Sequence, residues 1–125
     1  MRYIAIILFV FLLNPMIHGQ ATDINWPVFR GSGDLSGNTR HEMTANPSFL
    51  WSLPTGVRTI SSPVLSDGVI YFGNSKGTLY AINETGKIIW SLETGKTIEA
   101  PPLVFGDKVY VGSSDGVFRA INKLN

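Results

Sequence analysis

The segment "YFGNSKGTLYAIN" at residues 71–83 returns as "YVGSSDGVFRAIN" at residues 110–122, and this repetition is the strongest indication of the fold. An offset of 39 residues aligns Trp51 with Trp90, and 13 of the 33 positions in residues 51–83 then match their counterparts without a gap. Average composition would give roughly two or three matches by chance. A repeat period of about 40 residues is typical of solenoids and β-propellers.

Short strands rather than helices fill each repeat. Apolar or β-branched runs end at residue pairs that tolerate the positive φ of tight turns. In the first copy these pairs are Asp67-Gly68, Lys76-Gly77 and Thr85-Gly86. The runs predict one four-stranded antiparallel meander, with strands near 62–66, 69–74, 78–83 and 87–92. The second copy repeats the plan through Gly106-Asp107 and Asp115-Gly116.

The strand runs are apolar on consecutive residues, as in residues 69–72. A sheet with one face in water alternates apolar and polar residues, so both faces of these sheets are expected to be covered. Blades that stack around an axis cover both faces in this way. We therefore predict an all-β fold of β-propeller blades, with about two blades present and the propeller incomplete. A flat β-sandwich is the alternative, but it does not explain the 39-residue period.

The N-terminal segment has the layout of a secretory signal peptide. Arg2 supplies a positive charge, Ile4 to Leu13 form an apolar run, Pro15 follows, and the small residues Gly19 and Ala21 bracket a cleavage point. A bilayer span needs about 20 apolar residues, so this run is too short to cross one comfortably. We expect a periplasmic or secreted chain with no stable membrane anchor after cleavage. An uncleaved N-terminal anchor is the alternative.

The chain therefore divides into four expected segments. Residues 1–21 form the signal peptide, residues 22–50 a lead-in, residues 51–89 the first propeller repeat and residues 90–125 the second. The composition suits one small exported domain: 125 residues, a net charge of +1, and no cysteine for disulfides or a lipid anchor. The near-neutral charge gives no reason to expect nucleic acid as a partner.

One stretch, "AINETGKIIW" at residues 81–90, has the features of a tryptophan-docking site. Gly86 turns the chain where a side chain would clash, while Asn83 and Thr85 can bond local backbone groups. Ala81 leaves space for a large ring, and Trp90 needs one acceptor for its indole N–H. We expect Trp90 to fasten one blade to the next.

These residues resemble the docking motif of the pyrroloquinoline-quinone-like (PQQ-like) β-propeller repeat family, in which Asp usually stands at the place of Asn83. Residues 26–39 resemble the lead-in of exported members. The second motif begins at Ala120 and the sequence stops at Asn125, before its glycine and tryptophan. Since propellers have about four to eight blades, we expect an N-terminal fragment of a longer propeller. A short protomer that completes a ring with other copies is the alternative.

The resemblance implies a non-enzymatic scaffold or protein-binding module, with cell-envelope or outer-membrane protein assembly as one setting. Its expected partners are further propeller blades, other copies of the chain and envelope proteins. Quinoprotein dehydrogenases of the family hold the quinone beside calcium in the central funnel, and no catalytic, cofactor or metal residue matches here. The quinone and calcium are therefore expected only in a longer protein. The alternatives are the N-terminal part of a quinone-dependent dehydrogenase and a protomer of a ligand-binding ring.

Overall fold

The described residues of the chain form two antiparallel β-sheets without a helix. The structure is a computed structural model that describes residues 25–39, 42 and 45–124, so the expected signal peptide lies outside it. The first sheet consists of β1 (Val64–Ser66), β2 (Val69–Gly73), β3 (Thr78–Asn83) and β4 (Ile88–Glu93). The second sheet consists of β5 (Leu103–Phe105), β6 (Lys108–Gly112) and β7 (Phe118–Asn122). The predicted all-β class is confirmed.

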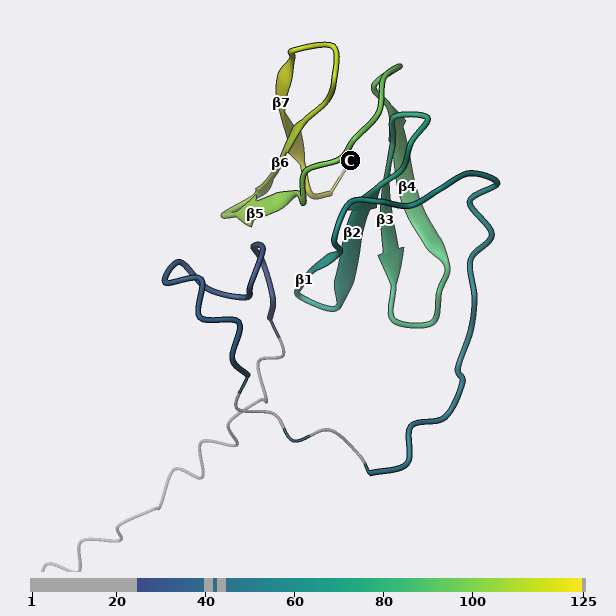
Figure 1. Cartoon of the computed structure of the whole chain (residues 1–125), viewed down its shortest axis with the longest axis vertical. Coiled ribbons are helices and arrows are strands. Elements are labelled where there is room, and N and C mark those ends of the chain that lie inside the picture. The colour runs from purple at the N-terminus through teal and green to yellow at the C-terminus, as the bar shows by residue number, and fades with distance from the viewer. Residues whose placement is uncertain (1–24, 40–41, 43–44, 125) are drawn as a thin grey trace, which may run out of the picture.

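Each sheet is a meander in which consecutive strands pair (Figure 1). The observed strands agree with the predicted ones to within two residues at each end. β1 begins at Val64 rather than residue 62, just after Pro63, which has no N–H to donate to a partner strand. The turn from β1 to β2 places Asp67 and Gly68 at φ values of 51° and 73°. The second sheet repeats the first three strands of this plan within the part of the chain that the structure describes.

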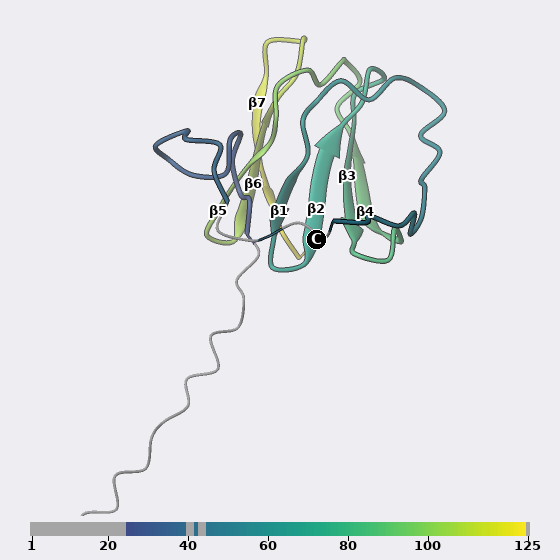
Figure 2. The same ribbon diagram turned by 60° about the horizontal axis from the view of Figure 1, so that its bottom comes forward.

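The two sheets lie face to face (Figures 1 and 2). Their facing side chains form the core. The first sheet contributes Val64, Tyr71, Leu79 and Ala81, and the second contributes Val104, Val109, Val111 and Ile121. In β3 and β6, each of which contributes two core residues, these residues are two positions apart, as expected for side chains on one face of a sheet. The contact between successive sheets is the arrangement predicted for neighbouring propeller blades.

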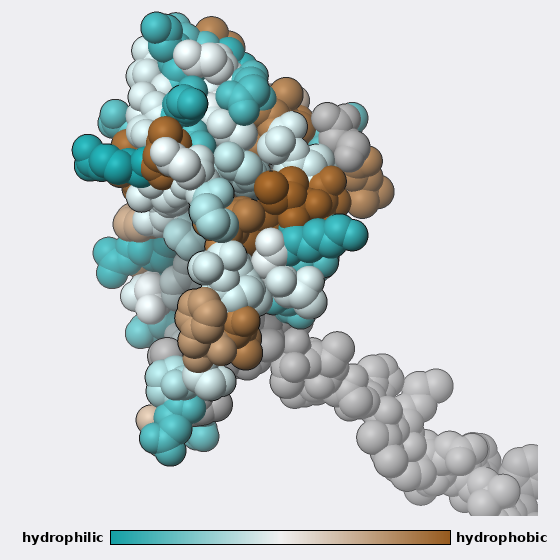
Figure 3. All heavy atoms as spheres, turned by 90° about the vertical axis from the view of Figure 1, so that its right-hand side faces the viewer, coloured by the Kyte–Doolittle hydropathy of each residue, from teal (hydrophilic) through white to brown (hydrophobic). Residues whose placement is uncertain are grey.

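The far face of the first sheet is covered by residues 51–63 of the same chain. Trp51, Leu53 and Pro63 of that segment line a hollow together with Phe72 and Ile82. Phe72 and Ile82 are themselves buried, so both faces of the first sheet are covered, as the consecutive apolar residues indicated. Figure 3 views the molecule from the side on which residues 45–60 and β4 lie, and shows hydrophobic patches among polar atoms.

The lead-in connects the first strands of both sheets (Figure 2). Trp26 and Leu65 of β1 exchange backbone hydrogen bonds of 2.7 and 2.9 Å, and Val104 of β5 donates its N–H to the carbonyl of Pro27 at 2.8 Å. The side-chain oxygen of Asn25 accepts a third bond, from the backbone N–H of Asp67. The lead-in therefore joins the two blades along one edge. In the described part of the chain, no helix is long and apolar enough to span a bilayer.

Candidate functional site

The turn after β3 is built by Asn83. Its side-chain oxygen accepts hydrogen bonds from the backbone N–H of Thr85 at 3.1 Å, the hydroxyl of Thr85 at 2.7 Å and the N–H of Lys87 at 2.9 Å. The N–H of Gly86 donates to the Asn83 carbonyl at 3.0 Å, and Gly86 has a φ of 80°. These bonds fix the turn without using the carbonyl of Glu84, which is left to accept a bond from elsewhere.

The Glu84 carbonyl accepts a hydrogen bond from the indole N–H of Trp51. The distance from Trp51 Nε1 to Glu84 O is 2.6 Å, and the indole ring lies over Gly86. A Cβ at Gly86 would come within 2.6 Å of the ring atoms, closer than packed carbon atoms approach. Glycine is therefore required at this position both for its positive φ and for the ring that covers it.

Trp90 makes the same contact with the second sheet. Its Nε1 donates to the carbonyl of Lys123 at 2.9 Å, and like the Trp51 bond this one spans 33 residues. Within the first sheet, Trp90 lies opposite Ala81, which in turn lies opposite Tyr71. The small Ala81 side chain leaves room for the two rings, whose centroids are 5.8 Å apart.

The five residues singled out from the sequence thus belong to two different contacts. Asn83, Thr85 and Gly86 form the turn that binds the Trp51 indole. Ala81 instead lies beside Trp90, whose indole binds the second sheet. The docking role of Trp51 was missed. Its equivalence to Trp90 in the 39-residue alignment is the signal that indicates it.

A cross-sheet ion pair lies beside the Trp90 contact. Lys123 Nζ lies 2.5 Å from the Asp67 carboxylate and 3.3 Å from the Ser66 hydroxyl. The hydrogen bond from Lys123, followed by its charge, lowers the pKa of Asp67 below its ordinary value of 3.8. Asp67 and Lys123 also line an open, mainly apolar hollow of about 580 Å³ between the sheets, together with Tyr71 and Ile89.

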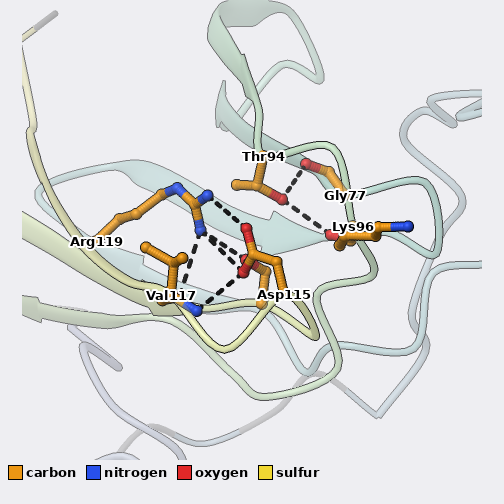
Figure 4. Close-up of polar contacts among 7 residues, drawn as sticks. Gly77, Thr94, Lys96, Asp115, Val117 and Arg119 are labelled. Carbon is orange, nitrogen blue, oxygen red and sulfur yellow. Dashed lines mark hydrogen bonds and ion pairs between the residues drawn. The ribbon is translucent and has the colours of Figure 1, made fainter.

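Polar contacts at the opposite ends of the sheets close turns (Figure 4). The Thr94 hydroxyl lies 2.8 Å from the Gly77 carbonyl and 2.9 Å from that of Lys96. Arg119 forms a 2.6 Å ion pair with Asp115, and the hydrogen bonds that Asp115 accepts hold its pKa far below its ordinary value. Each group is satisfied locally, so this cluster stabilises turns.

Among the residues that the structure describes, none covers the outward apolar face of the second sheet, which is here called the open face. It carries Leu103, Phe105 and Phe118, which are 39%, 75% and 70% exposed. On the first sheet, the counterparts of Leu103 and Phe118 at the 39-residue offset are Val64 and Leu79, which are 1% and 0% exposed. The open face therefore corresponds to the face that the first sheet buries against the second.

Residues 34–125 match the protein family described as outer membrane protein assembly factor BamB. The chain belongs to this family. The resemblance to PQQ-like β-propeller repeats, stated from the docking motif, is confirmed by this match. A search of curated protein sequences gave no match.

Solved structures place this BamB-family chain among β-propellers. It superposes on quinohemoprotein alcohol dehydrogenase from Comamonas testosteroni with a TM-score of 0.68 and 22% identity, covering 80% of this chain and 18% of that one. It superposes on BamB from Moraxella catarrhalis with a TM-score of 0.50 and 25% identity, covering 54% of this chain and 22% of that one. The chain thus spans about a fifth of either structure.

A calcium ion of the kind used by quinoprotein dehydrogenases finds no matching set of ligands in the described part of the chain. Such an ion takes six to eight oxygen ligands from carboxylates, carbonyl groups and waters. No group of three or more His, Cys, Asp or Glu side chains converges among the described residues. The described residues of this BamB-family chain therefore supply no cluster of carboxylates for such an ion.

Proposed function

We propose that the chain is an exported, non-catalytic propeller module that acts as a scaffold or protein-binding unit in the assembly of outer-membrane proteins. The family match over residues 34–125 carries this proposal. The open face supports a binding role, because contiguous exposed apolar surface often marks a site of protein contact. The layout of residues 1–21 supports export to the periplasm or beyond.

The carboxylates support a non-catalytic role. A general acid or base works best with a pKa near the working pH. In this chain, hydrogen bonds lower the pKa values of Asp34, Asp67, Asp107 and Asp115. These groups remain ionised at neutral pH and are weak bases. The likeness to the alcohol dehydrogenase, at 22% identity, concerns the fold alone and supports no reaction.

The role in assembly is tested in the organism that encodes the chain. Deletion of the gene is expected to lower the amount of folded outer-membrane β-barrel proteins, measured from their heat-modifiable migration in membrane fractions. Complementation with the wild-type gene should restore that amount. Unchanged levels of all outer-membrane proteins in the deletion strain would rule out the assembly role.

Export and the absence of catalysis are tested separately. A C-terminally tagged chain should appear in the periplasmic or secreted fraction, with a mature N-terminus near residue 22 in mass spectrometry. A cytoplasmic chain that retains Met1 would contradict export. The purified chain, supplied with pyrroloquinoline quinone and Ca²⁺, should not reduce an artificial electron acceptor in the presence of alcohols or sugars. Turnover would favour the dehydrogenase alternative.

A further inference from the structure

Three exposed cationic residues come from segments that meet at the end of the first sheet where β2 turns into β3. The N–H of Ser75 donates to the carbonyl of Arg58 at 2.9 Å. On the other side of Lys76, Gly77 lies directly against the backbone of Lys96, which a Cβ at this glycine would meet. Arg58, Lys76 and Lys96 are all exposed, and they are here called the basic cluster.

The charges of the basic cluster have no carboxylate partner among the described residues. The ion pairs in that part of the chain belong to Lys108, Arg119 and Lys123 instead. Figure 4 shows the Lys96 side chain extending away from the pair that Arg119 forms with Asp115. The three cationic side chains are therefore available to anionic groups from outside the described residues.

The second sheet builds the same turn without these cations. At the 39-residue offset, Thr97 stands at the place of Arg58, and Asp115 stands at the place of Lys76. The N–H of Ser114 still donates to the Thr97 carbonyl at 2.9 Å, so the backbone bond that holds the turn does not depend on a cation. The basic cluster thus adds charge that the fold does not require.

The turn of the first sheet is not built to hold a single phosphate ion. Anion sites of the nest type use successive free backbone N–H groups that converge on the anion. Here Lys76 donates its N–H to the side-chain oxygen of Asn74 at 3.0 Å, and Gly77 donates to the Asn74 carbonyl at 3.1 Å. The N–H of Ser75 is held by Arg58. The anionic partner is therefore left to the side chains, which come from three separate segments.

The basic cluster is also small for a membrane-binding site. Basic segments that bind anionic lipids carry about four to eight Lys and Arg residues. The cluster has three, in a chain whose net charge is only +1. A polypeptide that presents several carboxylates along its length matches three separate cations better than a membrane surface does.

We propose that the basic cluster binds an acidic segment of a protein partner, whose Asp or Glu carboxylates pair with Arg58, Lys76 and Lys96. The Arg58 guanidinium can hold one carboxylate through two parallel N–H bonds, while each lysine acts as a point charge. This inference rests on the basic cluster alone and does not depend on the proposed role in outer-membrane protein assembly.

Fluorescence anisotropy tests the proposal with a labelled synthetic peptide in which glutamate and serine alternate. The purified chain should bind this peptide at low salt, and the affinity should fall as added NaCl screens the charges. The control peptide carries glutamine in place of every glutamate and should not bind. Equal binding of the two peptides, or no binding of either, would overturn the proposal.

Matched substitutions locate the binding site. Lys76→Gln should weaken binding of the glutamate peptide by about two- to fivefold, the loss expected for one exposed ion pair. Arg58→Thr should weaken it to a similar extent, and it introduces the residue that the second sheet carries at this position. The control is Lys87→Gln, which removes an exposed cation just before β4, at the opposite end of the first sheet. Equal weakening by Lys76→Gln and Lys87→Gln would contradict the site.

Vesicles of phosphatidylglycerol and phosphatidylcholine distinguish a protein partner from a membrane. The chain should not sediment with these vesicles under the conditions in which it binds the glutamate peptide. Sedimentation that Lys76→Gln abolishes, without peptide binding, would overturn the proposal and assign the basic cluster to an anionic membrane. The melting temperatures of Lys76→Gln and Arg58→Thr should match that of the wild type, because both side chains are exposed. Weakened binding then reports the lost charge.

Discussion

Two tryptophans that lie 39 residues apart in the chain each donate to a carbonyl 33 residues further along. At the residue scale, the sequence repeat therefore corresponds to a repeated hydrogen bond between a tryptophan and a backbone carbonyl. The Trp90 indole extends from β4 to the turn after β7, and the Trp51 indole extends from the segment before β1 to the turn after β3. The turn needs Asn83 to fix its backbone and Gly86 to accept the ring. Glycine at position 86 is thus explained by a residue far away in sequence.

Gly86→Ala is expected to destabilise the chain by about 2–4 kcal/mol. The new methyl group would meet the Trp51 ring, and the positive φ adds about 1 kcal/mol of strain. The matched control is Gly95→Ala, which has the same φ of 80° and nothing within 4 Å of the added carbon. Urea unfolding followed by tryptophan fluorescence measures both variants. Equal losses in the two variants would contradict the ring contact.

Trp90→Ala is expected to cost about 3 kcal/mol, at the lower end of the range for a buried tryptophan because the indole is only partly covered. Trp90→Phe keeps a ring beside Tyr71 and removes the bond to the Lys123 carbonyl, so a smaller loss of about 1 kcal/mol is expected. Urea unfolding measures both. A loss below about 1 kcal/mol for Trp90→Ala would contradict the docking role.

At the scale of secondary-structure elements, the two sheets share one packing interface. Strand positions followed from the sequence because Asp67-Gly68 and similar pairs mark turns, while the runs between them are too short for helices. Strand ends were less accurate, as at β1, because pairing with a neighbour decides where a strand begins. The ion pair between Lys123 and Asp67 was not predicted, because it joins residues 56 positions apart.

Asp67→Asn tests this ion pair through its pH dependence. The pKa of Asp67 is lowered in the folded chain, so its stabilising contribution is complete well above 3.8 and is lost as the pH falls through the folded-state value. The melting temperature of the variant should therefore lie below that of the wild type at pH 7. The gap should close as the pH falls below about 3.8. A gap that stays constant from pH 7 to pH 3 would contradict the pair's contribution.

At the scale of the whole molecule, the lead-in completes the arrangement of the two blades. It pairs with β1 through Trp26 and accepts a bond from β5 through Pro27. Its resemblance to exported members of the family was visible in the sequence, but its place along the sheets was not. The open face likewise could not be predicted from the sequence, because its exposure depends on which segments of the folded chain lie beside the second sheet.

Trp26→Ala is expected to loosen the edge that the lead-in covers, at a cost of about 1–3 kcal/mol for a partly buried ring. Hydrogen exchange gives a local readout, because the N–H groups of Leu65 and Val104 donate to the lead-in. Both should exchange faster in the variant. Phe29→Ala, which truncates a half-exposed side chain, is the control and should cost less than about 0.5 kcal/mol. Unchanged exchange in Trp26→Ala would contradict the role of the lead-in.

The repeat, the all-β class, the meander order and the presence of a docking tryptophan could all be predicted from the amino-acid sequence. Turn pairs and run lengths are local signals that act over a few neighbouring positions, and the 39-residue period is visible when the sequence is compared with itself. The folded chain was needed to show which turn binds which indole, which lysine pairs with Asp67, and which face of the second sheet is exposed. Those outcomes depend on how one sheet lies against the next, and packing between distant segments leaves no local trace in the chain.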